Sequence, residues 1–360
     1  MEYLSARECM ERGAAALMDR FKPSELPPVN RFHYHQGVFL AGVERVYALT
    51  GNRKYRDYIK AWVDINIDEN GDCATYSDIM FDDIQPAVLL FGLYRETGDE
   101  RYKKMLDRLY RDVELWPTSA KGGLWHKKNK DNQLWLDTMY MFGVFAARYA
   151  HEFGKPYMYE RILQQAELMY RYMRNPETGL LYHMWDDSKQ AAHTDADGLV
   201  RVHWGRANGW YAAALAEMIG ILDEGSAVRE RLIEIERAYL ASVVKYQDKK
   251  SGLWYQVLDK GEDARNWTES SCTALFTYAL AKCLNMGVID ASYRENALLG
   301  YRGVMSKTEI KDGALLMNDI CVGTGVGEEE YYFKRPVSQN DLHGVGALLL
   351  MASEIYTQEK

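Results

Sequence analysis

The chain has 360 residues, of which 47% are hydrophobic and 27% are charged, with only 8 prolines. This composition suits a folded chain with a large buried core and excludes a disordered one. The formal net charge is -8 at pH 7 and no run of Lys or Arg interrupts it, so we expect neither nucleic acid nor an anionic membrane as a partner. An acidic substrate would need a local Arg or Lys in its cleft.

The N-terminal segment 1–21 carries charge throughout and lacks the apolar core of a signal peptide. No segment approaches the roughly 18 uninterrupted apolar residues of a membrane span. The cysteines are odd in number and widely spaced, which favours reduced thiols over a disulfide framework: Cys9, Cys73, Cys272, Cys283 and Cys321. These features predict a cytoplasmic protein, and they leave its oligomeric state open.

Apolar residues recur with helical spacing along the chain, and turn residues separate the periodic segments. About twelve helices are predicted, spanning 4–21, 34–49, 53–67, 83–97, 99–114, 134–152, 156–173, 205–222, 225–246, 270–285, 291–306 and 339–357. Strand signal is confined to short pieces such as GLWYQVL at 252–258. Because no stretch has the composition of a linker, we expect a single domain over residues 1–360.

A first repeat marks the junctions between consecutive helices. TGNRKY at 50–55 and TGDERY at 97–102 each place a Gly at the end of one helix, and FGKPY at 153–157 is a looser copy. Gly at this position takes the left-handed conformation that ends helices. The repeat therefore predicts tight connections within antiparallel helix pairs.

A second repeat marks the other kind of junction. A Gly followed by aromatic and polar residues precedes a Trp-containing unit that opens a helix, and the pattern occurs three times: GGLWH (122–126) before WLDT (135–138), GLLYH (179–183) before WGRA (204–207), and GLWYQ (252–256) before WTES (267–270). Short junctions at one end and long aromatic junctions at the other predict a ring of helical hairpins with one functional end. Six hairpins would make an all-α, (α/α)6 barrel with short β excursions in its loops.

Three charged residues take equivalent places in the second repeat: Asp137, Arg206 and Glu269. We therefore expect them to converge at the functional end of the barrel. A carboxylate near a helix N-terminus is favoured by the helix dipole, while aromatic neighbours desolvate it and raise its pKa. Asp137 is thus a candidate acid or base, and the alternative is a helix cap or a salt-bridge partner.

Asp82 and Asp83 precede an apolar helix, and one of them is expected to cap it. The local pattern does not decide which of the two faces the functional end. His126 and His183 end two of the aromatic turns, and neither has a partner at metal-ligand spacing. We expect no metal site, a core role for His126, and a site role for His183, which lies beside Trp185 and two carboxylates in LYHMWDDS.

Six tryptophans cluster at the long junctions: Trp125, Trp135, Trp185, Trp204, Trp210 and Trp267. The apolar faces of sugar rings stack on aromatic side chains, and their hydroxyls need charged or amide partners. This combination indicates a carbohydrate site, with roughly half of these tryptophans expected in the core. GTGVG at 323–327 lacks the strand and helix of a dinucleotide fingerprint, so we interpret it as a loop.

Eight blocks, taken in order, resemble the unsaturated rhamnogalacturonyl hydrolases of glycoside hydrolase family 105, and the similarity covers nearly the whole chain: HYHQGVFLAGVERVYALTG, FDDIQPAVLLFGLYRETGD, GGLWHKK, QLWLDTMYM, LYHMWDDS, WGRANGWY, SGLWYQVLD and NDLHGVGALLL. The resemblance implies an (α/α)6 barrel without a metal or other cofactor. It also implies the substrate, an unsaturated uronate oligosaccharide. The enzyme would release a 4,5-unsaturated galacturonyl residue from the non-reducing end of rhamnogalacturonan (pectin) lyase products.

The chemistry that the resemblance implies is hydration of the vinyl ether, which differs from the usual two-carboxylate displacement at the anomeric carbon. Matching motif to motif, Asp137 in WLDTMYM corresponds to the general acid/base of the family and Asp82 in FDDI to its second essential carboxylate. Asp137 must then hold a proton near neutral pH, and Asp82 would hydrogen-bond sugar hydroxyls or the attacking water. His183 in LYHMWDDS corresponds to a site histidine.

The substrate contacts that the resemblance implies are Trp204, Arg206 and Trp210 in WGRANGW. The forked guanidinium of Arg206 suits a uronate carboxylate. Three further contacts, Tyr34, Lys127 and Trp135, lie in blocks that depart from the family pattern, because Phe32 stands where a Trp is expected and NKDN precedes QLWLD.

Other functions remain open at this point. An unsaturated glucuronyl hydrolase acting on glycosaminoglycan or other polysaccharide-lyase products would use the same chemistry, and its substrate choice would depend on the junction loops. A sugar-binding ring without catalysis would bind the ligand and leave its double bond intact. An epimerase would need a pair of His residues across the sugar, whereas here carboxylates are expected at the functional end.

Overall fold

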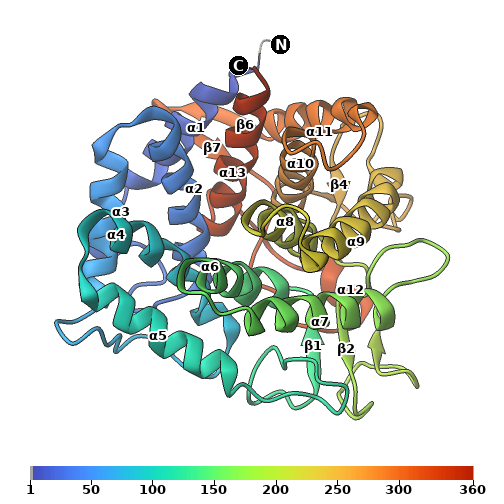
Figure 1. The fold of residues 1–360 in the computed structure, drawn as a ribbon. Coiled ribbons are helices and arrows are strands. Elements are labelled where there is room, and N and C mark those ends of the chain that lie inside the picture. The colour runs from blue at the N-terminus through green and yellow to red at the C-terminus, as the bar shows by residue number, and fades with distance from the viewer. Residues whose placement is uncertain (1–2, 360) are drawn as a thin grey trace.

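Six inner helices form a closed ring in the computed structural model, which describes residues 3–359 (Figure 1). They are α2 (Tyr34–Thr50), α4 (Val88–Thr97), α6 (Val144–Phe153), α8 (Gly205–Ile221), α10 (Ser270–Asn285) and α13 (Leu342–Glu359). Each packs on the next in this order, and α13 packs on α2 to close the ring. Nearly every residue of α8 and α10 is buried, because neighbours surround these helices on all sides.

Six outer helices surround this ring: α1 (Ala6–Met18), α3 (Arg53–Asn66), α5 (Glu100–Glu114), α7 (Tyr157–Tyr172), α9 (Ala227–Val243) and α11 (Arg294–Ser306). They are amphipathic, and α5 shows the pattern by burying Tyr102, Met105, Leu106, Leu109 and Val113 while its charged face meets solvent. The arrangement confirms the predicted (α/α)6 barrel. Among the helices of residues 3–359, none combines the length and apolar character that crossing a bilayer requires.

The connections from inner to outer helices are short and lie at one end of the barrel. Gly51, Gly98 and Gly154 end α2, α4 and α6 with φ angles of 67°, 66° and 65°, as the first repeat predicts. An L-residue with a side chain would pay about 1–2 kcal/mol for this left-handed conformation.

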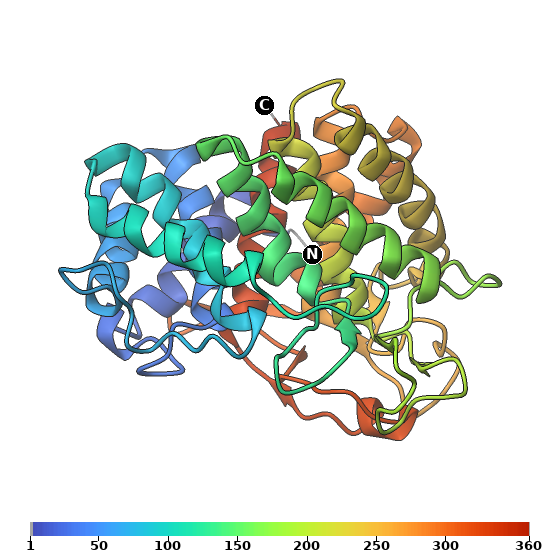
Figure 2. The same cartoon turned by 60° about the horizontal axis from the view of Figure 1, so that its bottom comes forward.

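The connections from outer to inner helices are long and gather at the other end, here called the loop end (Figure 2). Four small antiparallel sheets form there or beside it. Their strands are β1 (Gln133–Trp135), β2 (Met184–Asp186), β3 (Leu199–Val200), β4 (Trp254–Tyr255), β5 (Thr268–Glu269), β6 (Thr308–Lys311), β7 (Ala314–Met317), β8 (Ile320–Cys321) and β9 (Val337–Ser338). A short helix, α12 (Glu329–Phe333), also lies in this part of the chain.

The predicted helix 134–152 is wrong at its start. Its first residues pair with β2 as strand β1, and a π-helical turn at Met139–Gly143 precedes α6. The predicted helix 83–97 likewise begins as two 3-10 turns, Phe81–Asp83 and Gln85–Ala87. Pro86 has no N–H to donate, so the α-helix does not extend past it toward the N-terminus. Further 3-10 turns lie at Pro23–Glu25, Val244–Tyr246 and Ala291–Tyr293.

Candidate active site

One backbone hydrogen bond recurs at the loop end and fixes the register of the site. Just before an inner helix, an N–H donates to a carbonyl oxygen of the following connection, in four places: Phe81 to His126 (3.4 Å), Leu136 to His183 (3.2 Å), Gly205 to Gln256 (2.8 Å) and Ser270 to Asp319 (3.0 Å). The residue after each donor therefore takes an equivalent place. These residues are Asp82, Asp137, Arg206 and Ser271.

Glu269 was expected to converge with Asp137 and Arg206, and this register shows that it does not. Glu269 precedes its donor, Ser270, so it lies two residues out of the expected place. Its buried carboxylate caps α10 by accepting hydrogen bonds from the Cys272 N–H and the Ser271 hydroxyl. It also accepts from the Cys321 N–H at 2.8 Å. Glu269 therefore holds the loop end together and does not face the site.

The three charged residues of the register, Asp82, Asp137 and Arg206, face a common cavity of about 40 Å³. Seven of the nine predicted site residues line this cavity: Tyr34, Asp82, Lys127, Trp135, Asp137, Trp204 and Arg206. His126, Met141 and Thr324 complete the lining. The remaining two predicted residues, His183 and Trp210, stand behind the wall.

His183 lies directly behind Asp137. Its Nε2 is 3.2 Å from Asp137 Oδ2 and its Nδ1 is 2.6 Å from the hydroxyl of Tyr332, while the ring itself is fully buried. An ionised Asp137 only accepts hydrogen bonds, so Nε2 must carry the proton and Nδ1 must accept from the Tyr332 hydroxyl. Tyr332, on α12, thus fixes the tautomer of His183, and His183 orients Asp137.

The surroundings of the two carboxyl groups favour protonation of Asp82, whereas Asp137 was expected to hold the proton. Burial raises the pKa of Asp82 to about 7; nearby Lys127 opposes the rise, and the negative charge of Asp137 adds to it. Burial also acts on Asp137, but the hydrogen bond from His183 outweighs it and holds the pKa of Asp137 below its ordinary value. The two carboxyl groups therefore hold about one proton between them below about pH 7.

Asp83, the alternative to Asp82, faces away from the cavity. Its side chain is fully buried, with Oδ1 3.4 Å from Arg31 Nη2 and 4.0 Å from His33 Nε2. Burial raises its pKa to about 6, against the attraction of Arg31. The structure thus separates the two neighbours, which the sequence pattern alone leaves equivalent.

Arg206 and Lys127 supply the positive charge of the cavity. The Arg206 guanidinium lies 4.6 Å from the ring of Trp204 and donates hydrogen bonds to the carbonyl oxygens of Cys321 and Val322. Lys127 Nζ lies 5.1 Å from the ring of Trp135. With Asp82 protonated, two cations and one anion leave a net charge of +1, which suits a ligand with one carboxylate.

The tryptophans divide between site and core. Trp135 and Trp204 line the cavity, whereas Trp210 is buried behind it, between Tyr34 at 6.5 Å and Tyr140 at 4.7 Å. Of the others, Trp185 stacks on Tyr172 away from the cavity. Trp210 therefore supports Tyr34 from behind.

Sequence reasoning missed several parts of the site. His126, expected in the core, lines the cavity with Nε2 3.8 Å from Asp82 Oδ1, and burial lowers its pKa to about 3. Its equivalence to His183 in the second repeat was the signal that pointed to it. Thr324 belongs to the GTGVG loop, and Tyr332 belongs to α12; no periodicity marks either one.

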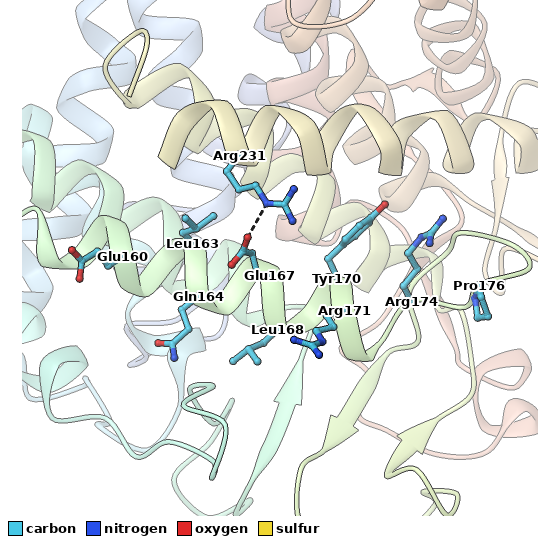
Figure 3. A pocket seen from close by; sticks show the side chains of 10 residues that line it. All are labelled: Glu160, Leu163, Gln164, Glu167, Leu168, Tyr170, Arg171, Arg174, Pro176 and Arg231. Carbon is cyan, nitrogen blue, oxygen red and sulfur yellow. Dashed lines mark hydrogen bonds and ion pairs between the residues drawn. The ribbon is translucent and has the colours of Figure 1, made fainter. Parts of the chain in front are cut away.

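A larger groove of about 880 Å³ lies on the outside of the barrel, between α7 and α9 (Figure 3). Solvent-exposed side chains line it, and Arg231 already pairs there with Glu167 at 2.8 Å. It holds no buried pair of carboxylates. Its chemistry therefore does not match that of the smaller cavity, and we place the site in the cavity.

Comparisons with known proteins agree with this architecture. The model of Glycosyl Hydrolase Family 88 matches residues 9–358. The unsaturated rhamnogalacturonyl hydrolase YesR of Bacillus subtilis (strain 168) is 26% identical over 331 residues, which cover 90% of this chain and 89% of that protein. A family 105 glycoside hydrolase of C. acetobutylicum ATCC 824 superimposes with a TM-score of 0.92 at 32% identity, covering 98% of this chain and 100% of that one. An unsaturated glucuronyl hydrolase specific for heparin shares the fold, with a TM-score of 0.72 at 14% identity over 98% of this chain and 97% of its own.

Proposed function

The chain belongs to Glycosyl Hydrolase Family 88, and from this premise we propose that it removes a 4,5-unsaturated galacturonyl residue from the non-reducing end of rhamnogalacturonan lyase products. The likeness to the rhamnogalacturonyl hydrolase of B. subtilis supports the choice of substrate. One observation carries the proposal. Asp82 and Asp137, which hold about one proton between them, line the same cavity as Arg206.

The uronate carboxylate would bind beside Arg206 and Lys127, since these are the cations of the cavity. Trp135 and Trp204 would face the sugar, because indole rings stack on the apolar faces of pyranosides. The negative charge of the bound uronate raises the pKa of nearby carboxyl groups, and Asp137 then takes up the shared proton. His183 and Tyr332 keep its carboxyl group in place throughout.

Asp137 then donates its proton to C4, and the electron pair of the C4=C5 double bond forms the new C4–H bond. The positive charge that results is shared by C5 and the ring oxygen. Water attacks C5 and returns a proton to the Asp137 carboxylate, with Asp82 accepting a hydrogen bond from the water or the sugar. The hemiketal opens to a C5 ketone, and the aglycone leaves as an alcohol when C1 becomes an aldehyde.

Asp137→Asn is expected to lower turnover by at least about 10²–10⁴-fold, the range that a positioned acid/base contributes. Binding should change little, because Asn keeps the shape of the side chain. The measurement follows the ultraviolet absorbance of the unsaturated uronate in an unsaturated galacturonyl-rhamnose disaccharide. The matched control is Asp131→Asn, an exposed residue of the same connection. Wild-type loss of the absorbance by Asp137→Asn would refute the role.

A panel of pectin-derived and glycosaminoglycan-derived unsaturated disaccharides tests the substrate. We expect the galacturonyl-rhamnose compound to give the highest kcat/KM. A preference for glucuronyl compounds would support the proposed hydration chemistry but contradict the proposed galacturonyl substrate. Binding of every compound without loss of the double bond would remove the enzymatic proposal altogether.

A further inference from the structure

Outside the cavity, the described residues include a group of two histidines and one aspartate: His35, Asp341 and His343. His35 lies in the first turn of α2, Asp341 directly precedes α13, and His343 lies in the first turn of α13. One potential ligand atom from each residue falls within 4.8 Å of the others. The group therefore spans the seam at which the first and last inner helices close the ring (Figure 1).

His343 points to a missing partner. Its side chain is fully buried, and Nε2 has no hydrogen-bond partner among residues 3–359. Nδ1 lies 2.7 Å from Asp341 Oδ1. A buried nitrogen without a hydrogen bond costs about 1–3 kcal/mol. An unpartnered imidazole nitrogen beside a second histidine and a carboxylate is available to bind a metal ion.

The tautomer of His35 agrees with this interpretation. His33 and His35 join their Nδ1 atoms at 3.0 Å, and His33 Nε2 lies 4.0 Å from the Asp83 carboxylate. If His33 keeps its proton on Nε2, toward Asp83, then its Nδ1 accepts from the Nδ1–H of His35. His35 Nε2 is then left with a lone pair that faces Asp341 Oδ1 at 3.7 Å. Two electron-rich atoms facing each other need a cation between them.

This chain of hydrogen bonds also supplies the outer partner that metal-binding histidines normally have. A ligating imidazole donates its other N–H to an acceptor, which fixes its orientation. Here His33 is that acceptor for His35.

We propose that His35, Asp341 and His343 bind a divalent transition-metal ion, with Zn²⁺ the best match to two imidazoles and one carboxylate. Zn²⁺ takes such ligands at about 2.0–2.2 Å with tetrahedral geometry, which leaves the fourth position for water. The ion joins α2 to α13 beside Tyr34, whose ring lies 4.2 Å from that of His35. It holds the wall of the cavity and takes no part in the glycosidase chemistry. The positive charge of Arg206 acts on His35 and Asp341, and it weakens the binding of a cation there by repulsion.

Titration of the EDTA-treated full-length protein with ZnCl₂ in a calorimeter tests the site. One Zn²⁺ per chain should bind with micromolar affinity, and the thermal midpoint of unfolding should rise with the Zn²⁺ concentration, because the ion binds only the closed ring. Bound Co²⁺ should show the absorption of a four-coordinate ion. Absence of saturable binding of one equivalent overturns the proposal.

Substitutions in the proposed site and away from it test where the ion binds. His35→Gln should weaken binding by at least about 10-fold, and His33→Gln, which removes only the outer partner, by about 10–100-fold. His151→Gln and His193→Gln are matched controls, because each removes an exposed imidazole that lies beside a carboxylate. Both should bind Zn²⁺ as the wild type does. Unchanged binding by His35→Gln and His33→Gln, in protein with a wild-type circular dichroism spectrum, would place the ion elsewhere and overturn the proposal.

Discussion

Lys127 and Asp137 act on the same proton in opposite directions. Asp137 raises the pKa of Asp82 by repulsion, and Lys127 lowers it by attraction. The pKa of Asp82 is therefore also set by a third residue, a cation that lines the same cavity. A carboxyl group with a pKa of about 7 is protonated below that pH, so we expect activity to fall as the pH rises through about 7.

Lys127→Met should move this fall in activity to higher pH. Removal of the ammonium group takes away an attraction that favours ionised Asp82, so the pKa of Asp82 should rise, by roughly half a unit to one unit. KM should also rise, since Lys127 lines the cavity. A pH profile of kcat/KM measures the shift.

Lys128→Met is the control for this prediction. Lys128 is the next residue along, but its ammonium group lies 3.1 Å from Asp78 and over the ring of Trp116, outside the cavity lining. The pH profile of kcat/KM of Lys128→Met should coincide with that of the wild type. If both variants keep the wild-type profile, Asp82 is not the group whose ionisation limits activity.

Helix α12 contributes to the site from a connection that carries no periodic signal. Tyr332 reaches from it to His183, and the Tyr332 backbone carbonyl accepts a hydrogen bond from the side chain of Gln256, which in turn bonds the indole of Trp204. A five-residue helix thus supports both the acid/base side and the aromatic side of the cavity.

Tyr332→Phe should lower kcat by about 10–100-fold with a smaller change in KM, because the variant frees His183 to adopt the other tautomer while the cavity keeps its lining. Tyr331→Phe removes a neighbouring hydroxyl of α12 whose partner is the Gly325 N–H, and it should retain most of the activity. Steady-state kinetics of both variants distinguish two causes of lower activity. One is loss of the Tyr332 hydroxyl that positions His183, and the other is a general disruption of helix α12. An equal decrease in both would show that the helix, and not the Tyr332 hydroxyl, matters.

The elements differ in how far the sequence predicts them. Helices with a long apolar period, such as α5 and α2, the second of which also ends in Gly51, were predicted within a few residues of their bounds. The π-turn before α6 and strand β1 were not, because tertiary pairing with β2 overrides the helical pattern of residues 134–138. Likewise the place of Glu269 depends on a hydrogen-bond register that only the folded connections reveal.

The residues of the candidate site also differ in how far the sequence predicts them. Repeats and family resemblance indicated the seven predicted residues that line the cavity, because their place at the start of an inner helix or its connection is local in sequence. The sequence favoured Asp137 as the holder of the proton, whereas the surroundings in the folded site favour Asp82, because the proton affinities depend on how His183 and Lys127 lie around the two carboxyl groups. The histidines at the seam between α2 and α13 come from segments about 300 residues apart, so no spacing rule brings them together.

At the scale of the whole molecule, the interface between the helical layers contains a buried acid. Glu236 of the outer helix α9 is fully buried, its Oε2 has no hydrogen-bond partner among the described residues, and burial raises its pKa well above 4.5. The folded protein therefore binds this proton more tightly than the unfolded chain does. Its contribution to stability is largest near and below pH 4.5 and decreases as the pH rises.

Glu236→Met should raise the free energy of unfolding by about 1–4 kcal/mol at pH 8, because an apolar side chain of similar volume replaces a desolvated carboxyl group. The gain should be smaller at pH 5. Urea unfolding at the two pH values measures it. Glu230→Met, on the exposed face of α9, should change stability by no more than about 0.5 kcal/mol at either pH. A gain that is equal at both pH values would contradict the prediction.

Closure of the ring through α2 and α13 has a consequence for how the barrel is made. The two helices that meet there are separated by nearly the whole chain, so their contact forms only after the intervening hairpins have stacked. Before that, the stack is an open horseshoe whose two apolar flanks, on α2 and α10, lack the helix that covers them. This form would expose apolar surface on both flanks, through which two molecules can associate before either ring closes.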